Sequence, residues 1–222
     1  MIEFIPRTPV NLSEDWMILI FLFALVSLAY TRALYPARLE RLWKSTWNVR
    51  ALHQAIREEP NTPRASLLFN ISFYLTFSLI LFLVIKYYGH EPLGYSGLGF
   101  YLLILGAVVT VYLLKTIGIH VVQILADGDF GLMEYKYNVF LINRMIGLML
   151  VPFALYIAYA PTTSVRPALW AALGVCVVMI VYRIMRGLVN ALSMGVPPFY
   201  IFFYICTLEI LPFAVCCKAL SL

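Results

Sequence analysis

The amino-acid sequence predicts an all-α integral membrane protein with six transmembrane helices. Of its 222 residues, 63% are apolar and only 12% are charged, whereas a soluble domain is about 45–50% apolar and about 25% charged. The apolar residues form six runs of about 20 residues, the length that an α-helix needs to cross a bilayer. None of these runs has the alternating pattern of an outer-membrane barrel strand. We therefore expect one polytopic membrane domain over residues 1–222.

The six predicted spans follow one another with short connections. Aromatic residues mark both ends of the first span, as is typical of residues at a membrane surface. Pro152 is expected to interrupt the fourth span, because proline lacks the N–H that a helix interior requires. The spans occupy residues 16–35, 65–88, 100–122, 139–160, 167–188 and 198–218.

The segment 36–58, between the first two spans, predicts amphipathic helices on the membrane surface. Pro36 suits a helix start, and Pro60 ends the segment. Apolar residues share one helical face and cations occupy the others, which is the pattern of a helix lying on anionic phospholipids. The apolar face comprises Leu39, Leu42, Trp43 and Trp47, and the cations are Arg38, Arg41 and Lys44.

The distribution of lysine and arginine predicts the orientation of the spans. With both termini on the outer side, twelve of the 16 cationic residues fall at inner ends and loops, and four fall on the outer side. Positive residues concentrate on the cytoplasmic side of membrane proteins. We therefore expect both termini outside and the amphipathic segment at the cytoplasmic surface.

Glu209 is the unusual residue of the sixth span. It lies eleven residues into the span, about 16 Å deep and close to the bilayer midplane. Pro212 leaves the Leu208 carbonyl without its helical donor, so a kink is expected beside the acid. A carboxylate at this depth is expected to face protein or water. It could bond a neighbouring helix, with Lys115 the favoured partner, contact a partner subunit, or handle protons or ions.

A layer of polar residues is predicted near the cytoplasmic boundary. Lys115 and Arg183 each lie about 15 residues from the outer end of their span, which puts them about 7–8 Å from that boundary. Arg144 and Asn70 reach the same level from the inner side, and Arg186 follows Arg183 by one turn. If these groups face inward, they form a basic pocket for a lipid phosphate or another anion. If they face outward, the cations snorkel to the interface and mark topology alone.

The motifs of common enzymes and metal sites are missing from the sequence. Its three histidines are dispersed, no Cys/His group has zinc spacing, and neither a P-loop nor a G-x-S-x-G motif occurs. We therefore expect no metal, no cofactor and no nucleic-acid partner, and the prediction is that the chain is not an enzyme. A membrane enzyme stays the third of three functional hypotheses.

Two stretches resemble the ends of a known family. The stretch DWMILIFLFALVSLAYTRALYPARLE at 15–40 is similar to the opening, and FYIFFYICTLEILPF at 199–213 is similar to the end, of a family of small polytopic proteins from Bacteroidota, which is known as a domain of unknown function. The arrangement of Asn143–Arg144, Gly147 and Pro152 also fits that family. The resemblance implies a bacterial inner-membrane location and implies no activity.

Two hypotheses about function lead. The first is a non-catalytic subunit or scaffold of an inner-membrane envelope complex, such as one serving protein export or secretion, with other inner-membrane proteins and lipid as partners. The second is a small transporter or a lipid- or anion-handling protein that uses Glu209 and the basic pocket. The change Glu209→Gln separates them, because loss of function with intact assembly favours the second.

Overall fold

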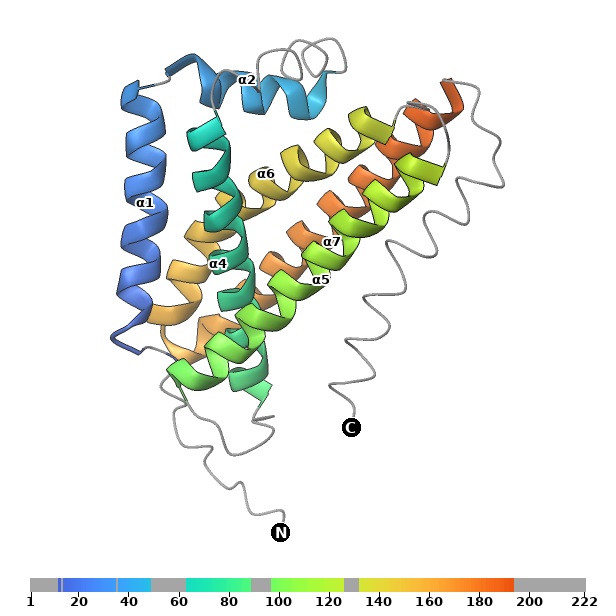
Figure 1. Ribbon diagram of the computed structural model, residues 1–222. Coiled ribbons are helices and arrows are strands. Elements are labelled where there is room, and N and C mark those ends of the chain that lie inside the picture. The colour runs from blue at the N-terminus through green and yellow to red at the C-terminus, as the bar shows by residue number, and fades with distance from the viewer. Residues whose placement is uncertain are drawn as a thin grey trace.

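The computed structural model describes residues 12, 14–34, 36–48, 63–88, 97–125 and 132–193. These residues form six α-helices and no strand, as Figure 1 shows. The helices are α1 (Met17–Leu34), α2 (Pro36–Trp47), α4 (Pro63–Tyr88), α5 (Leu98–Leu125), α6 (Leu132–Tyr159) and α7 (Thr162–Ser193).

Five of these helices are long and apolar enough to cross a membrane, and they coincide within a few residues with the first five apolar runs of the sequence. Their membrane-length parts are Met17–Leu34, Ser66–Tyr88, Leu98–Gly118, Tyr137–Tyr159 and Ser164–Val189. The sixth predicted span, 198–218, lies outside the described residues, and so do Glu209 and Pro212. The predicted surface segment is described only over 36–48.

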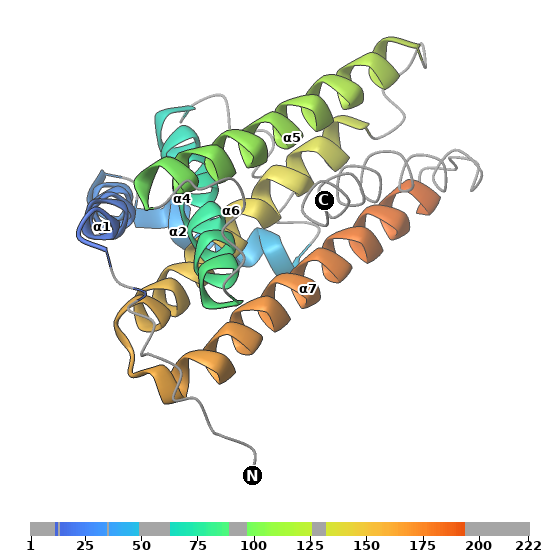
Figure 2. The same ribbon diagram turned by 90° about the horizontal axis from the view of Figure 1, so that it is seen from below.

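The short helix α2 lies across one end of the bundle, above α1 and α4 in Figure 1. The helices α4, α5, α6 and α7 run between this end and the opposite one, and Figure 2 shows α6 between α5 and α7. The helices α1 and α4 both meet the α2 end, where α2 also contacts α6. We refer below to the α2 end and the opposite end of the bundle.

The contact between α4 and α6 forms the centre of the molecule. Both helices start at the α2 end, so they run in the same direction (Figure 1). Their backbones come close together at Gly147, where an added Cβ would stand 2.6 Å from the Cα of Phe73. Glycine at this position allows the two backbones to come together, as small residues do in many membrane helix pairs.

The prediction that Pro152 interrupts the fourth span was wrong, because α6 continues through Pro152 to Tyr159. Membrane helices tolerate proline when their neighbours adjust to the missing hydrogen bond. The helix α7 likewise starts at Thr162 and contains Pro167 in its second turn. The fifth span therefore begins earlier than the sequence predicts.

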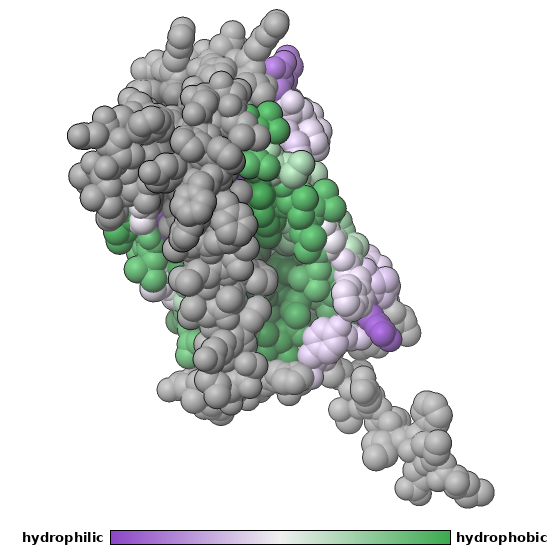
Figure 3. All heavy atoms as spheres, turned by 90° about the vertical axis from the view of Figure 1, so that its right-hand side faces the viewer, coloured by the Kyte–Doolittle hydropathy of each residue, from purple (hydrophilic) through white to green (hydrophobic). Residues whose placement is uncertain are grey.

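Large apolar side chains cover much of the outward surface of the bundle. Figure 3 shows an apolar band on one side, with hydrophilic residues toward its ends. A protein surface that faces the hydrocarbon chains of lipids must be apolar, because the bilayer core offers no hydrogen-bond partner to polar groups. The most exposed apolar side chains of α5 and α7 include Leu113, Leu114, Ile117, Trp170, Val178, Val181 and Val189.

Glu14 joins three helices at the end opposite α2. Its Oε1 accepts a 2.6 Å hydrogen bond from the Lys86 ammonium at the end of α4. Its Oε2 accepts a 2.7 Å bond from the indole N–H of Trp16. The Trp16 ring packs against Phe82 of α4 and Tyr101 of α5. This partly buried ion pair therefore fixes the start of α1 against both neighbours.

The Glu14–Lys86 pair predicts a loss of stability in acid. Burial acts to raise the pKa of Glu14, but the hydrogen bonds from Lys86 and Trp16 and the charge of Lys86 outweigh burial and lower the pKa. Because the pKa of Glu14 is lower in the folded than in the unfolded chain, its interaction stabilises the protein fully at pH values above the unfolded pKa of about 4.3. This stabilisation is lost as the pH falls through the folded pKa. We expect Glu14→Gln to cost about 1 kcal/mol near neutral pH and to flatten the fall of Tm with acid.

The measurement is Tm as a function of pH in detergent for the wild type, Glu14→Gln and Glu40→Gln. Glu40→Gln is the matched control, because the Glu40–Lys44 pair on α2 is mostly exposed and such pairs add little. A Glu14→Gln variant with the Tm profile of the wild type would contradict this prediction.

Candidate functional site

Four cationic side chains from three helices are buried inside the bundle. Lys115 on α5 is 6% exposed, Arg144 on α6 is 6% exposed, and Arg183 and Arg186 on α7 are 5% and 7% exposed. Side chains that snorkel to the membrane surface expose their charged ends. These four side chains instead face protein, so the layer in which they lie is an internal feature of the bundle.

Two of the arginines are held by asparagine side chains on neighbouring helices. Nε of Arg144 donates a 2.8 Å hydrogen bond to Oδ1 of Asn70, which joins α6 to α4. Nη1 of Arg183 donates a 2.9 Å hydrogen bond to Oδ1 of Asn143, which joins α7 to α6. Because Asn143 and Arg144 are adjacent, both bonds lie at the same level of α6.

Lys115 lies at this level too. The ring of Tyr112, one turn earlier on α5, packs against Phe73 and Tyr74 of α4 at centroid distances of 5.3 and 5.5 Å. The helices α4 and α5 run in opposite directions (Figure 1). One turn further along α5 therefore corresponds to one turn back along α4, which brings Lys115 level with Asn70. We call Asn70, Lys115, Asn143, Arg144, Arg183 and Arg186 the basic layer.

Arg186 connects the basic layer to α2. Its Nη1 donates a hydrogen bond to the main-chain carbonyl of Thr46, in the last turn of α2. The hydroxyl of Tyr182 donates a 2.6 Å bond to the same carbonyl. The last carbonyls of a helix lack intrahelical donors and carry partial negative charge, so a guanidinium there is favourable. Arg186 therefore caps α2 and fixes it against α7.

The structure divides the predicted apolar face of α2 into two. Leu42 and Thr46 are buried against the bundle, whereas Trp43 and Trp47 are 51% and 54% exposed. The two indole rings contact each other at 6.0 Å, and Trp47 also contacts the ring of Tyr182. Leu42 therefore faces the bundle, whereas Trp43 and Trp47 lie on the exposed side of α2.

The cations of α2 lie on the exposed surface. Arg41 and Lys44 are exposed, and Lys44 pairs with Glu40 at 2.5 Å. The Arg38 side chain lies outside the described residues. Exposed tryptophan and cationic side chains are the groups that bind at a phospholipid surface.

Within the predicted spans, acidic residues are far fewer than the cations of the basic layer. Among the described side chains, the acids Glu14, Asp15 and Glu40 are partly or fully exposed, and none lies in a span. Of the eleven acidic residues in the sequence, only Glu209 falls within a predicted span. The predicted spans therefore hold more buried cations than acids.

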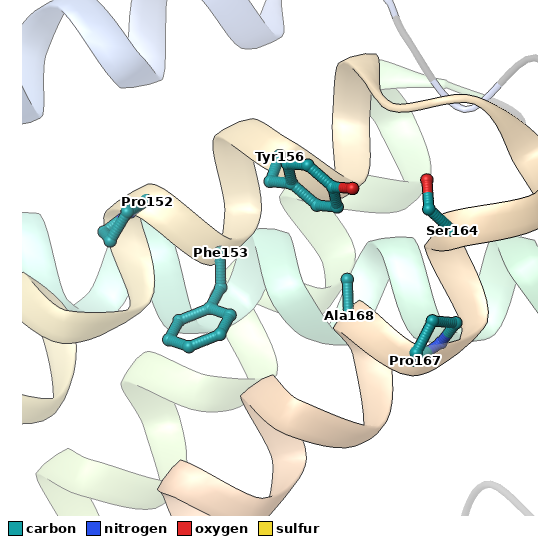
Figure 4. A pocket seen from close by; sticks show the side chains of 6 residues that line it. All are labelled: Pro152, Phe153, Tyr156, Ser164, Pro167 and Ala168. Atoms are coloured by element: carbon teal, nitrogen blue, oxygen red, sulfur yellow. The ribbon is translucent and has the colours of Figure 1, made fainter.

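A shallow depression of about 450 Å³ lies between α6 and α7, near the end opposite α2. Figure 4 shows Phe153 and Tyr156 of α6 on one side of it and Ser164, Pro167 and Ala168 of α7 on the other. Pro152 completes its lining. The lining is almost wholly apolar and contains no charged residue, so the depression suits a hydrocarbon chain and is separate from the basic layer.

The comparisons with known proteins identify the family. The family model described as a domain of unknown function, DUF4271, matches residues 17–220. The chain belongs to the DUF4271 family. No curated protein and no solved structure matches this DUF4271 chain. In the described part of the chain, His, Cys, Asp and Glu form no group of three that could hold a metal ion.

Sequence reasoning missed three residues of this DUF4271 site. The sequence marks Asn143 only through the family resemblance, although its place beside Arg144 puts it at the same level of the helix. Tyr182 and Thr46 carry no signal, because the Thr46 acceptor is a main-chain atom and any residue supplies one. The predicted acid, Glu209, lies outside the described residues, so its pairing with Lys115 stays a prediction.

Proposed function

We propose that this DUF4271 protein is a non-catalytic inner-membrane protein that binds phosphate-bearing anions, above all anionic phospholipids, at its basic layer. The observation that supports this function is the burial of four cationic side chains against a single acid in the predicted spans. The proposal selects the anion-handling hypothesis over a scaffold without ligands.

The physical argument is the cost of buried charge. An ion removed from water loses several kcal/mol of solvation unless a counter-charge and hydrogen bonds replace it. Asparagine oxygens accept hydrogen bonds from Arg144 and Arg183, and a bound phosphate would add counter-charge to the layer. Lipid phosphates are the abundant anions at the edge of the bilayer, and basic pockets between membrane helices bind them.

The topology of this proposal has six spans, with both termini in the periplasm and α2 on the cytoplasmic surface of a bacterial inner membrane. The ratio of twelve inner to four outer cations supports this orientation. The exposed Trp43, Trp47, Arg41 and Lys44 support contact of α2 with phospholipid headgroups. The single-domain assignment over residues 1–222 belongs to the same proposal.

A second candidate is a non-catalytic subunit of an envelope complex, for example one serving protein export. The exposed apolar faces of α5 and α7 favour it, because a neighbouring membrane protein can cover them as well as lipid does. The two candidates are compatible, since a subunit can also bind lipid. They differ in what remains bound after mild extraction.

Native mass spectrometry after mild-detergent extraction tests both candidates. We expect the wild type to retain phosphatidylglycerol in preference to phosphatidylcholine. Arg144→Met should weaken this retention about tenfold, because charge-assisted hydrogen bonds to phosphate are strong. Arg166→Met is the control, since Arg166 is exposed near the end of α7 opposite α2.

Equal retention of the two lipids by the wild type would contradict the proposed function. The same spectra report protein partners. A stoichiometric second protein would support the envelope-complex candidate, and a monomer free of partners would count against it. Glu209→Gln should leave phosphatidylglycerol bound, because it removes no positive charge.

A further inference from the structure

The guanidinium of Arg186 has one edge occupied and one edge open. Its Nη1 donates to the Thr46 carbonyl. Its Nε and Nη2 are buried and have no hydrogen-bond partner among the described residues. The whole side chain is 7% exposed, so bulk water does not satisfy these donors.

The open edge has a specific chemical shape. The N–H groups of Nε and Nη2 point in parallel from the same side of the planar guanidinium, and their spacing matches two oxygens of one phosphate or carboxylate. A single carbonyl or hydroxyl oxygen cannot take both bonds in line. Buried charged donors without acceptors are costly. An anion that offers two oxygens therefore fits this edge.

The depth of Arg186 favours a phosphate over the acid of the sixth predicted span. Arg186 lies three residues before Val189, the end of the membrane-length part of α7, which is about 4.5 Å along the helix. This is the depth at which lipid headgroups begin. Glu209, by contrast, is predicted about 16 Å from the inner boundary of its span, near the midplane.

We propose that the Nε–Nη2 edge of Arg186 is the primary phosphate contact of the anion site, an inference that rests on the proposed function. The Thr46 carbonyl holds the opposite side of the guanidinium and so directs the open edge toward the ligand. Tyr182, bonded to the same carbonyl, is a positioning residue. The phosphate belongs to an anionic lipid or is free inorganic phosphate.

Asn138 does not contribute to this edge, although both polar atoms of its side chain are buried without a partner among the described residues. It lies five residues before Asn143, whose side chain faces α7. Five residues correspond to a rotation of about 140° around α6 from that direction. Asn138 therefore lies on another side of α6.

The test compares Arg186→Lys with the wild type in nanodiscs of phosphatidylglycerol diluted into phosphatidylcholine. Lysine keeps the positive charge but cannot form the paired bonds. We expect retention of phosphatidylglycerol to fall about tenfold or more, while Arg32→Lys, at an exposed position of α1, leaves it unchanged. Titration of inorganic phosphate into delipidated protein shows whether the ligand is a lipid headgroup or free phosphate, since only a site for free phosphate binds it. If free phosphate binds, Arg186→Lys must weaken that binding too.

The two proposals fail in different ways. A wild type without preference for phosphatidylglycerol contradicts the proposed function itself. A wild type with that preference and an Arg186→Lys variant that binds equally well overturns the Arg186 edge alone. If the carboxylate of Glu209 occupies the edge, a double-mutant cycle between Arg186→Lys and Glu209→Gln shows strong coupling, which also overturns it.

A measurement on the wild type covers the case in which Arg186→Lys does not fold. A phosphatidylglycerol analogue with a photoreactive headgroup should crosslink near the end of α2 and near Arg186 on α7. Crosslinks confined to other helices would overturn the proposal. Tyr182→Phe should change the fluorescence of Trp47, whose ring is 5.3 Å from that of Tyr182. It should also weaken lipid retention less than Arg186→Lys does. A loss of retention equal to or greater than that of Arg186→Lys would contradict the positioning role of Tyr182.

Discussion

Gly147→Ala is expected to lower the free energy of unfolding by about 1–3 kcal/mol, the range for overpacking a well-packed core. The added methyl group would stand 2.6 Å from Cα and 2.8 Å from Cβ of Phe73. The nearest atom is backbone, so no rotamer change relieves the contact. The helices α4 and α6 must separate, and the contacts along their shared interface weaken together.

Two glycines of the same chain provide matched controls. Gly106 on α5 and Gly174 on α7 have no atom within 4 Å of an added Cβ. Alanine is preferred to glycine in a helix interior by up to about 1 kcal/mol, so Gly106→Ala and Gly174→Ala should not destabilise. Steric trapping in bilayers, or Tm in detergent, measures all three.

A combined variant tests the cause. Shortening Phe73 to alanine leaves its Cα in place, so Gly147→Ala with Phe73→Ala should remain destabilised. Recovery of stability in this double variant would show that the added methyl group clashes with the Phe73 ring and not with the Phe73 backbone. A Gly147→Ala protein as stable as Gly106→Ala would contradict the close backbone contact.

Asn143→Leu is the second change with a large expected effect. It removes the oxygen that accepts from Nη1 of Arg183 and leaves that donor in a nearly closed site. Hydrogen bonds to charged groups contribute about 1.5–3 kcal/mol, and leaving the charged partner unsatisfied costs the upper part of that range. We expect a loss of about 2–3 kcal/mol in unfolding free energy.

Changing both partners should reverse the loss. Replacing a buried polar pair with apolar residues of similar size is often neutral or stabilising. The double variant Asn143→Leu with Arg183→Leu should therefore recover most of the stability of the wild type. Its retention of phosphatidylglycerol should nevertheless stay low, because one of the four buried cations is gone.

The stability and the lipid retention of the double variant report two different roles of Arg183. If the double variant remains as unstable as Asn143→Leu, Arg183 has a structural role beyond its bond to Asn143. If the double variant retains phosphatidylglycerol like the wild type, Arg183 does not contribute to anion binding. Unfolding in detergent and native mass spectrometry measure the two properties on one preparation.

The sequence locates the five long apolar helices within a few residues, because an apolar run of membrane length favours one continuous helix. The depth of single residues also follows from the sequence, since the helical rise is fixed. Asn70 and Arg144 were predicted at one level, and they form a hydrogen bond. These properties depend on one helix at a time, so they need no knowledge of its neighbours.

The rotation of each helix about its axis is what the sequence leaves open. Side-chain packing between neighbours sets it, and apolar residues all round a membrane helix give no preferred face. For this reason the sequence could not decide whether Lys115 and Arg183 face protein or lipid. The difference in burial between Leu42 and the two tryptophans of α2 has the same origin, because contacts of α2 with α1 and α6 set which side is buried.

The parallel packing of α4 on α6 has a consequence for how the chain is made. Helices that run in the same direction cannot be joined by a short turn, and here α5 must cross the membrane between them (Figure 1). During synthesis, α4 therefore enters the bilayer well before the helix that covers its central face. Until α6 arrives, the polar side chain of Asn70 and the backbone at Phe73 lack their final neighbours. The nascent chain consequently passes through a stage in which the central face of α4 is not yet packed.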